Sequence, residues 1–231
     1  MTDTTQDMSA LQMHWQALHR EPRHLLSHPS EAVIRWRHAH LPKPALASDR
    51  VLDIGCAGGR HTFFLATEGF GVDAVDIADA ATATVAERAA RYGPRVKTKT
   101  VAADALDFAD ANFAGVLSFG VYTYMDNAAV KASLQQIRRM LRPGGTLFLV
   151  TRAHSDWRAN FGTRLSNGYV RADRLADTPA EPENGLTMNL PDRNQVESWL
   201  ADFHDAEINF QSWTTNGGRY VNVDWHVVAT R

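Results

Sequence analysis

The residues with the clearest chemical potential lie between Val51 and Arg60, where the sequence reads VLDIGCAGGR. A short apolar run ends in a loop that holds Gly55, Gly58 and Gly59, and an amphipathic segment follows at once. This order predicts a buried strand, a tight turn and a helix. Glycines let a ligand approach backbone N–H groups, and a helix N-terminus adds unpaired donors and a positive dipole end. The loop is therefore expected to bind a polar or anionic, nucleotide-like ligand.

Strands and helices are expected to alternate from residue 50 onward and to position this loop. The expected strands are roughly 50–54, 71–76, 96–101, 113–119 and 145–151. The expected helices between them are roughly 59–69, 79–91 and 127–141. Alternation of this kind predicts a parallel sheet with helices on both faces.

The C-terminal part departs from this alternation. Residues 152–190 are polar and show no clear period, and a connection of that length is usually functional or mobile. Two alternating runs, 205–214 and 219–230, are joined by Asn216-Gly217-Gly218, which predicts a β-hairpin. The expected fold is therefore α/β, with a Rossmann-like doubly wound sheet that is mostly parallel and ends in an antiparallel hairpin.

Composition limits the classes of function. The chain has 231 residues, 44% hydrophobic and 22% charged, as in a soluble globular domain. A net charge of −2 gives no reason to expect a nucleic acid or an anionic membrane as partner. One cysteine and no apolar run of membrane-spanning length favour a cytoplasmic protein.

The N-terminal 45 residues are expected to differ from the rest. Residues 1–10 are polar and are expected to be disordered, and residues 11–40 are expected to be helical, with Ser30 as an N-cap. Six of the ten histidines fall in this region: His14, His19, His24, His28, His38 and His40. No pair has the compact spacing of a zinc motif and no cysteine accompanies them, so no metal site is expected.

Five pieces of the chain together resemble class I S-adenosylmethionine-dependent methyltransferases. They are Val51–Gly59, Val75–Ile77, Ala103–Ala105, Leu117–Tyr124 and Leu141–Leu149, in the order and at the spacing of that family. The resemblance implies the class I methyltransferase fold, with residues 1–45 as a tail and helical lid. Residues 46–231 would then form the methyltransferase domain, with 152–190 as an acceptor-side loop region.

The resemblance also implies S-adenosylmethionine as cofactor and a set of binding residues. These are Asp53, Gly55, Cys56, Ala57, Gly59, Asp76, Ile77, Asp104, Ala105, Ser118 and Phe119. In the family, Asp53 would bond toward the methionine amino group, Asp76 would accept both ribose hydroxyls, and Asp104 would contact the adenine amino group. Alternatively, Asp76 and Asp104 serve as helix N-caps and Cys56 only packs. Ala57 stands where the family usually has glycine.

The reaction implied is in-line displacement on a sulfonium methyl by a small-molecule acceptor, with a hydroxyl oxygen as first choice and nitrogen or carbon as open alternatives. His154 is the best candidate general base by its ordinary pKa, although it could be a surface loop residue. Tyr122, Tyr124 and Asp156 also follow strand ends near the expected methyl group. The two tyrosines could instead be walls of the pocket.

Three arginines and two other classes of function stay open. Arg152, Arg158 and Arg171 could bind an acidic acceptor, or they could be ordinary solvated side chains. An NAD-dependent oxidoreductase would need a Gly-x-Gly-x-x-Gly pattern, which Ala57 and Arg60 break. A non-catalytic S-adenosylmethionine-binding module is the third hypothesis. The expected partner is a small-molecule acceptor, without nucleic acid or membrane, and a homodimer is possible.

Overall fold

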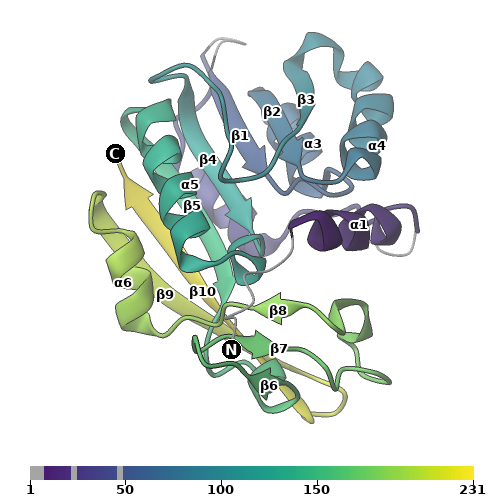
Figure 1. The fold of residues 1–231 in the computed structure, drawn as a ribbon. Helices are drawn as coiled ribbons and strands as arrows, with labels where there is room; N and C mark the ends of the chain where they lie inside the picture. Colours follow the sequence, from purple (N-terminus) through teal and green to yellow (C-terminus); the bar gives the residue numbers. More distant parts are fainter. Residues whose placement is uncertain (1–7, 22–24, 46–48) are drawn as a thin grey trace.

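The centre of the protein is a seven-stranded sheet in the order β3-β2-β1-β4-β5-β10-β9 (Figure 1). A computed structural model describes residues 8–21, 25–45 and 49–231. The strands of the sheet are β1 Arg50–Ile54, β2 Gly71–Asp76, β3 Val96–Thr100, β4 Phe113–Phe119, β5 Leu141–Arg152, β9 His204–Thr215 and β10 Tyr220–Thr230. Strands β1 to β5 pair in parallel, whereas β10 runs antiparallel to both β5 and β9. The predicted mostly parallel α/β sheet with a closing hairpin is confirmed.

Helices cover both faces of this sheet. They are α1 Met8–Leu18, α2 Glu31–His40, α3 Arg60–Thr67, α4 Asp79–Ala89, α5 Asn127–Met140 and α6 Arg193–Trp199. Successive strand residues point to opposite faces, so Val51 joins the hydrophobic cluster under α2 and α3, while Leu52 joins the cluster under α5 and α6. Both side chains are fully buried, as expected for a central parallel strand covered on two sides.

Strand β5 begins earlier than the sequence indicates. Leu141 already pairs with Phe113, and the register then shifts before Thr146 pairs with Gly115. Pro143, Gly144 and Gly145, which follow the end of α5 at Met140, therefore lie inside an irregular first part of the strand. Gly144 has a φ of +75°, which favours glycine, and this allows the local bend.

The two N-terminal helices occupy different places. Helix α2 packs on the sheet, where Trp36 stacks on Phe148 with ring centroids 5.6 Å apart. Helix α1 lies between α4 and the C-terminal half of the chain (Figure 1). Residues 8–10, which were expected to be disordered, form the first turn of α1; residues 1–7 lie outside the described residues. Ser30 occupies the N-cap position of α2, but its hydroxyl makes no capping hydrogen bond.

The segment 152–190 has more structure than its sequence indicates. It contains a small sheet of β6 Thr163–Arg164, β7 Val170–Arg171 and β8 Thr187–Met188, with 3₁₀ turns at Trp157–Asn160 (η4) and Glu181–Glu183 (η5). Trp157, Leu175 and Met188 are buried in a hydrophobic cluster of its own, which Leu11 of α1 and Tyr124 join. Strands of two residues are too short to produce an alternating pattern, so hydrophobic periodicity does not indicate this sheet.

Candidate functional site

A cavity of about 450 Å³ opens at the C-terminal ends of β1, β2 and β4. Its lining residues are Met8, Leu11, Trp15, Ile54, Gly55, Ala57, Asp76, Ile77, Val101, Ala102, Ala103, Asp104, Phe119, Gly120, Val121, Tyr124, Met125, Asp126 and Ala129. This edge is where open α/β sheets bind their ligands, because the chain crosses to opposite faces there. The cavity includes many of the predicted cofactor residues and one predicted catalytic residue, Tyr124.

The glycine loop between β1 and α3 needs its glycines. Gly55 has a φ of +72°, and a β-carbon there would overlap the Val121 side chain. Gly59 has a φ of +80°, and its β-carbon would fall 2.7 Å from the Phe63 ring. The backbone nitrogen of Gly55 donates to the Val75 carbonyl, which fixes the loop on β2. Ala57 lines the cavity with a φ of +46°, so the family's usual glycine would be less strained at this position.

The Asp76 carboxylate joins the loop to the start of α4. Oδ2 accepts a hydrogen bond from the Ala57 nitrogen at 3.0 Å, and Oδ1 accepts one from the Ala78 nitrogen at 2.9 Å. The N-cap position of α4 belongs to Ala78, so Asp76 is not the capping residue. A carboxylate offers about four acceptor directions, which leaves room for two ligand hydroxyls.

Asp53 lies behind the loop and outside the cavity lining. Its side chain is 1% exposed, and Oδ2 accepts a hydrogen bond from the Thr62 hydroxyl at 2.6 Å. The pKa of Asp53 is raised to about 6, chiefly by burial and to a lesser extent by the neighbouring Asp76, while the Thr62 hydrogen bond opposes the shift. The carboxylate therefore holds α3 against β1, and its predicted contact with the cofactor stays a prediction.

Arg60 is a candidate binding residue that the sequence analysis used only to exclude a dinucleotide. It is the first residue of α3, and its guanidinium carbon lies 5.1 Å from the centroid of the Phe119 ring, which lines the cavity. No described carboxylate lies within ion-pair distance of this half-buried cation, and burial lowers its pKa. A cation at a helix N-terminus is unfavourable unless an anion joins it. The position of Arg60 directly after the glycine loop was the sequence signal that could have identified it as a binding residue.

The remaining predicted cofactor residues divide into two groups. Ile77, Asp104 and Phe119 line the cavity, and the Asp104 backbone carbonyl is fixed by the Gln136 amide at 2.7 Å. The others lie behind the wall or beside it: Cys56, Gly59, Ala105 and Ser118. Burial raises the pKa of the Cys56 thiol well above its ordinary value, which fits a packing residue.

Of the four predicted catalytic residues, the structure brings only Tyr124 to the cavity. Tyr122 is fully buried and its hydroxyl lies 2.8 Å from that of Ser133. The two tyrosines belong to one 3₁₀ turn, Tyr122–Tyr124 (η3), with three residues per turn, so their side chains point in different directions. His154 is exposed and Asp156 is held by Arg158, both away from the lining. Tyr122, His154 and Asp156 thus lie outside the lining of this cavity, and their catalytic roles stay predictions.

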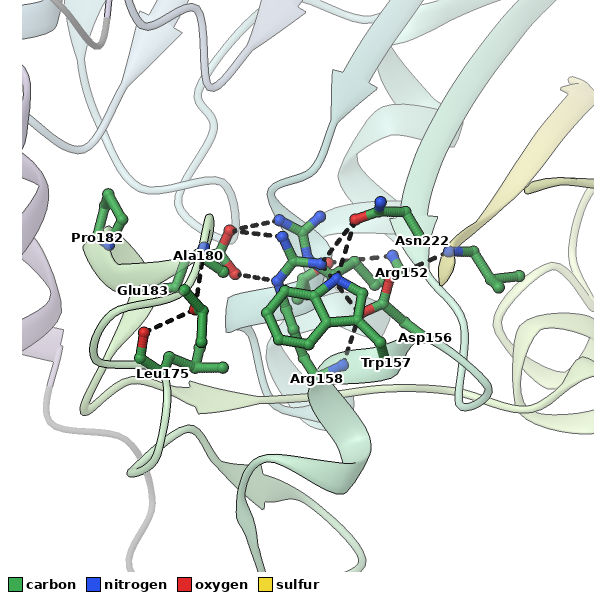
Figure 2. A network of polar contacts seen from close by, with 12 residues as sticks. Arg152, Asp156, Trp157, Arg158, Leu175, Ala180, Pro182, Glu183 and Asn222 are labelled. Atoms are coloured by element: carbon green, nitrogen blue, oxygen red, sulfur yellow. Dashed lines mark hydrogen bonds and ion pairs between the residues drawn. The ribbon is translucent and has the colours of Figure 1, made fainter. Parts of the chain in front are cut away.

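Arg152, Asp156, Arg158 and Glu183 form a buried network of charged side chains (Figure 2). Glu183 and the two arginines interact electrostatically with Tyr124. Arg152 Nη2 lies 2.6 Å from Glu183 Oε1, and Arg158 Nε lies 2.9 Å from Glu183 Oε2. Arg158 also pairs with Asp156 at 3.0 Å and donates to the Asn222 side chain at 3.2 Å. Neither predicted role for these two arginines matches this arrangement, because both side chains are ion-paired inside the protein. Arg171 is exposed on β7.

Helix α1 connects the two sides of the cavity. The Gln12 amide donates to the Ile77 carbonyl at 3.0 Å, next to the end of β2. On the other side, His14 Nε2 lies 2.7 Å from the carbonyl oxygen of Pro182, in the turn that holds Glu183. Within the described ranges, no group of three histidine, cysteine, aspartate or glutamate side chains could hold a metal ion.

Comparison with known proteins supports the resemblance to methyltransferases that the sequence shows. Residues 51–145 match the family described as "Methyltransferase domain". Ubiquinone biosynthesis O-methyltransferases of Parvibaculum lavamentivorans and Sinorhizobium medicae are 32% and 34% identical over 102 residues, which is 44% of this chain and 40% of each relative. The match thus spans about two fifths of the length of these curated relatives.

Solved structures extend the likeness in fold over most of the chain. A SAM-dependent methyltransferase of Methanosarcina mazei is 24% identical, with a TM-score of 0.65, covering 84% of this chain and 95% of its own. The 1,6-didemethyltoxoflavin-N1-methyltransferase of Burkholderia thailandensis is 19% identical, with a TM-score of 0.67, covering 96% and 88%. The sheet order and the cavity at the C-terminal ends of the strands agree with this fold. The family match over residues 51–145, the relatives and the shared fold together support a class I S-adenosylmethionine-dependent methyltransferase, with S-adenosylmethionine as the cofactor.

Proposed function

We propose that this protein transfers the methyl group of S-adenosylmethionine to a small-molecule acceptor, with a hydroxyl oxygen as the nucleophile. The observation that carries this proposal is the single cavity that runs from Asp76 and Asp104 to Tyr124 beneath α1. One end offers carboxylates for a nucleoside, and the other offers an apolar space for a second molecule. Two relatives are named as O-methyltransferases, which supports oxygen as the acceptor atom.

Four contacts would hold the cofactor. The free acceptor directions of Asp76 would take the two ribose hydroxyls, and Asp104 would take the adenine amino group. The half-buried cation of Arg60, together with the N-terminus of α3, would bind the carboxylate of the methionine part. The glycine loop would let the ligand contact backbone N–H groups without obstruction by β-carbons.

The bound cofactor supplies an electrophilic sulfonium methyl, so the protein's task is to align the acceptor and exclude water. Trp15 and Leu11 of α1 cover the cavity, and Tyr124 and Met125 form its wall beyond the end of β4. Burial and the adjacent Glu183 raise the pKa of the Tyr124 hydroxyl, which keeps it a neutral phenol. Tyr124 therefore orients the acceptor and is not proposed as a base.

A product assay tests the proposal. Purified protein is incubated with S-adenosylmethionine and a panel of phenols, catechols, alcohols and amines, and S-adenosylhomocysteine is measured by chromatography. We expect S-adenosylhomocysteine to form only with an acceptor, and most with hydroxyl acceptors. If calorimetry shows that S-adenosylmethionine binds but no acceptor in the panel turns over, a non-catalytic binding module is favoured.

We also propose a reducing, cytoplasmic setting without a nucleic-acid partner. The one cysteine, Cys56, is buried, and a net charge of −2 offers no general attraction to phosphates. None of the helices in the described part of the chain has the length and apolarity to cross a membrane. A homodimer stays a proposal that light scattering during size-exclusion chromatography would test.

A further inference from the structure

The acceptor end of the cavity is apolar and carries no positive charge. The residues that form it beyond the cofactor contacts are Leu11, Trp15, Val121, Tyr124 and Met125. Trp15 and Tyr124 meet edge to face, with ring centroids 5.0 Å apart and planes at 69°. No lysine or arginine occurs among the described lining residues. Aromatic walls and a methionine favour a flat, apolar ring as ligand.

Arg152 and Arg158, two cations that interact electrostatically with Tyr124, are paired with carboxylates (Figure 2). Glu183 pairs with Arg152 at 2.6 Å and with Arg158 at 2.9 Å, and Arg158 pairs with Asp156 as well. Asp224 is a third carboxylate at this network and is 6% exposed. Three carboxylates therefore face two arginines, which leaves no excess positive charge for an incoming anion.

The carboxylate of a charged acceptor would be desolvated in this space without forming an ion pair with a lysine or arginine. Burying an unpaired charge is strongly unfavourable, whereas an uncharged ring of the same size has no such cost. Three acidic residues, Asp76, Asp104 and Asp126, are among the lining residues, and their negative charge adds to the effect. The electrostatics of this end thus depend on whether Arg152 and Arg158 stay neutralised.

We propose that Glu183 is a specificity-determining residue, which neutralises Arg152 and Arg158 so that the acceptor is an uncharged aromatic alcohol. This inference rests on the proposed function, because it concerns the acceptor end of the same cavity. Glu183 does not line the cavity; it acts through the two arginines and through Tyr124, beside which its carboxylate lies. Its neighbour Glu181 is exposed and has no contact with this network, so it serves as a control.

The test compares catechol with 3,4-dihydroxybenzoate, which have the same ring and hydroxyls and differ by one carboxylate. Binding of each to protein saturated with S-adenosylhomocysteine is measured by calorimetry for the wild type, Glu183→Gln and Glu181→Gln. We expect the wild type and Glu181→Gln to favour catechol by about tenfold or more, the size of effect of an unpaired buried charge. Glu183→Gln removes the excess negative charge of this network and the 2.6 Å ion pair of Arg152, so the preference for catechol should fall.

Two further variants distinguish a loss of charge at position 183 from a folding defect. Glu183→Asp keeps the negative charge and should keep the preference for catechol. Combining Glu183→Gln with Arg152→Gln removes one charge of each sign and should restore the preference. Thermal unfolding of each variant confirms that the protein compared is folded.

Three results would overturn the inference. They are equal or stronger wild-type binding of 3,4-dihydroxybenzoate, no binding of either ring, and an equal loss of both ligands in Glu183→Gln, which a purely structural role would give. Saturation with S-adenosylhomocysteine is measured first. If S-adenosylhomocysteine does not bind, the proposed function is contradicted. If it binds but the titrations with catechol and 3,4-dihydroxybenzoate fail, only the assignment of the acceptor is contradicted.

Discussion

Two buried carboxylates show how differently the two ends of the site are built. Asp53, beneath the glycine loop, has hydroxyl and backbone partners but no ion pair, and burial raises its pKa to about 6. Glu183, beside the acceptor end, is almost as deeply buried, yet Arg152 and Arg158 outweigh burial and hold its pKa below the ordinary value. The cofactor end is thus held by backbone turns and local hydrogen bonds. The acceptor end is held by charges that come from distant parts of the chain.

The largest expected effect is on the charged network. Arg158→Ala should lower the free energy of unfolding by about 3–5 kcal/mol, because it leaves Glu183 and Asp156 buried with one cation removed. Urea unfolding followed by circular dichroism measures this. Arg171→Ala, at an exposed position, should stay within about 0.5 kcal/mol of the wild type. Equal losses in both variants would contradict the contrast between the two ends.

The pH dependence of stability should expose the unpaired acid at the cofactor end. A raised pKa means that folded Asp53 keeps its proton up to about pH 6, whereas its unfolded carboxyl loses it near 3.8. Between these values the folded state holds more protons, so stability falls as the pH rises, by a total of about 3 kcal/mol at most.

Asp53→Asn serves as the comparison for that measurement. Urea unfolding is repeated from pH 4 to pH 7 for the wild type and for the variant, and the difference between the two curves isolates Asp53. We expect the wild type to lose stability relative to the variant over this window. If the stabilities of the wild type and the variant change equally with pH, the pKa of Asp53 is not raised in the folded state.

The ribose contact should have a smaller but specific effect. Asp76→Asn should weaken binding of S-adenosylhomocysteine by about 1–3 kcal/mol, the scale of lost hydrogen bonds to a charged group. Calorimetry measures the change, with the exposed Asp107→Asn as the control that should bind normally. Unchanged affinity in Asp76→Asn would mean that the ribose lies elsewhere.

The smallest effect is expected at Arg60, which is only half-buried. Arg60→Gln should weaken binding of S-adenosylhomocysteine by about 1 kcal/mol, since solvent screens part of the charge. Binding of 5′-methylthioadenosine, which lacks the carboxylate, should be unaffected. A similar loss for both ligands would show that Arg60 shapes the loop and does not bind the carboxylate.

The sequence predicted the fold around the glycine loop well, because its determinants are local. The expected strand 50–54 coincides with β1, and Gly55, Asp76 and Asp104 lie at or after the ends of β1, β2 and β3, next to the cavity. Hydrophobic periodicity and turn residues carry that information within short stretches of chain. Ala57 was the one unexpected residue of the loop, and its positive φ confirms that it is strained.

The acceptor end could not be predicted in the same way. Glu183 meets Arg152 across 31 positions, and nothing in the local pattern of either residue indicates the pair. His154 was favoured as a base by its ordinary pKa alone, but the bend after β5 leaves it exposed. Tyr122 and Tyr124 looked equivalent in sequence, and only the turn that holds them separates a core residue from a wall of the cavity.

Calorimetric titration of the wild-type protein with S-adenosylhomocysteine and, separately, with NAD tests the central claim most directly. The glycine loop, Asp76 and the absence of a third glycine at Arg60 all concern which of these ligands the cofactor end accepts. We predict saturable binding of S-adenosylhomocysteine at one site per chain and no binding of NAD. Saturable binding of NAD with no response to S-adenosylhomocysteine would contradict it.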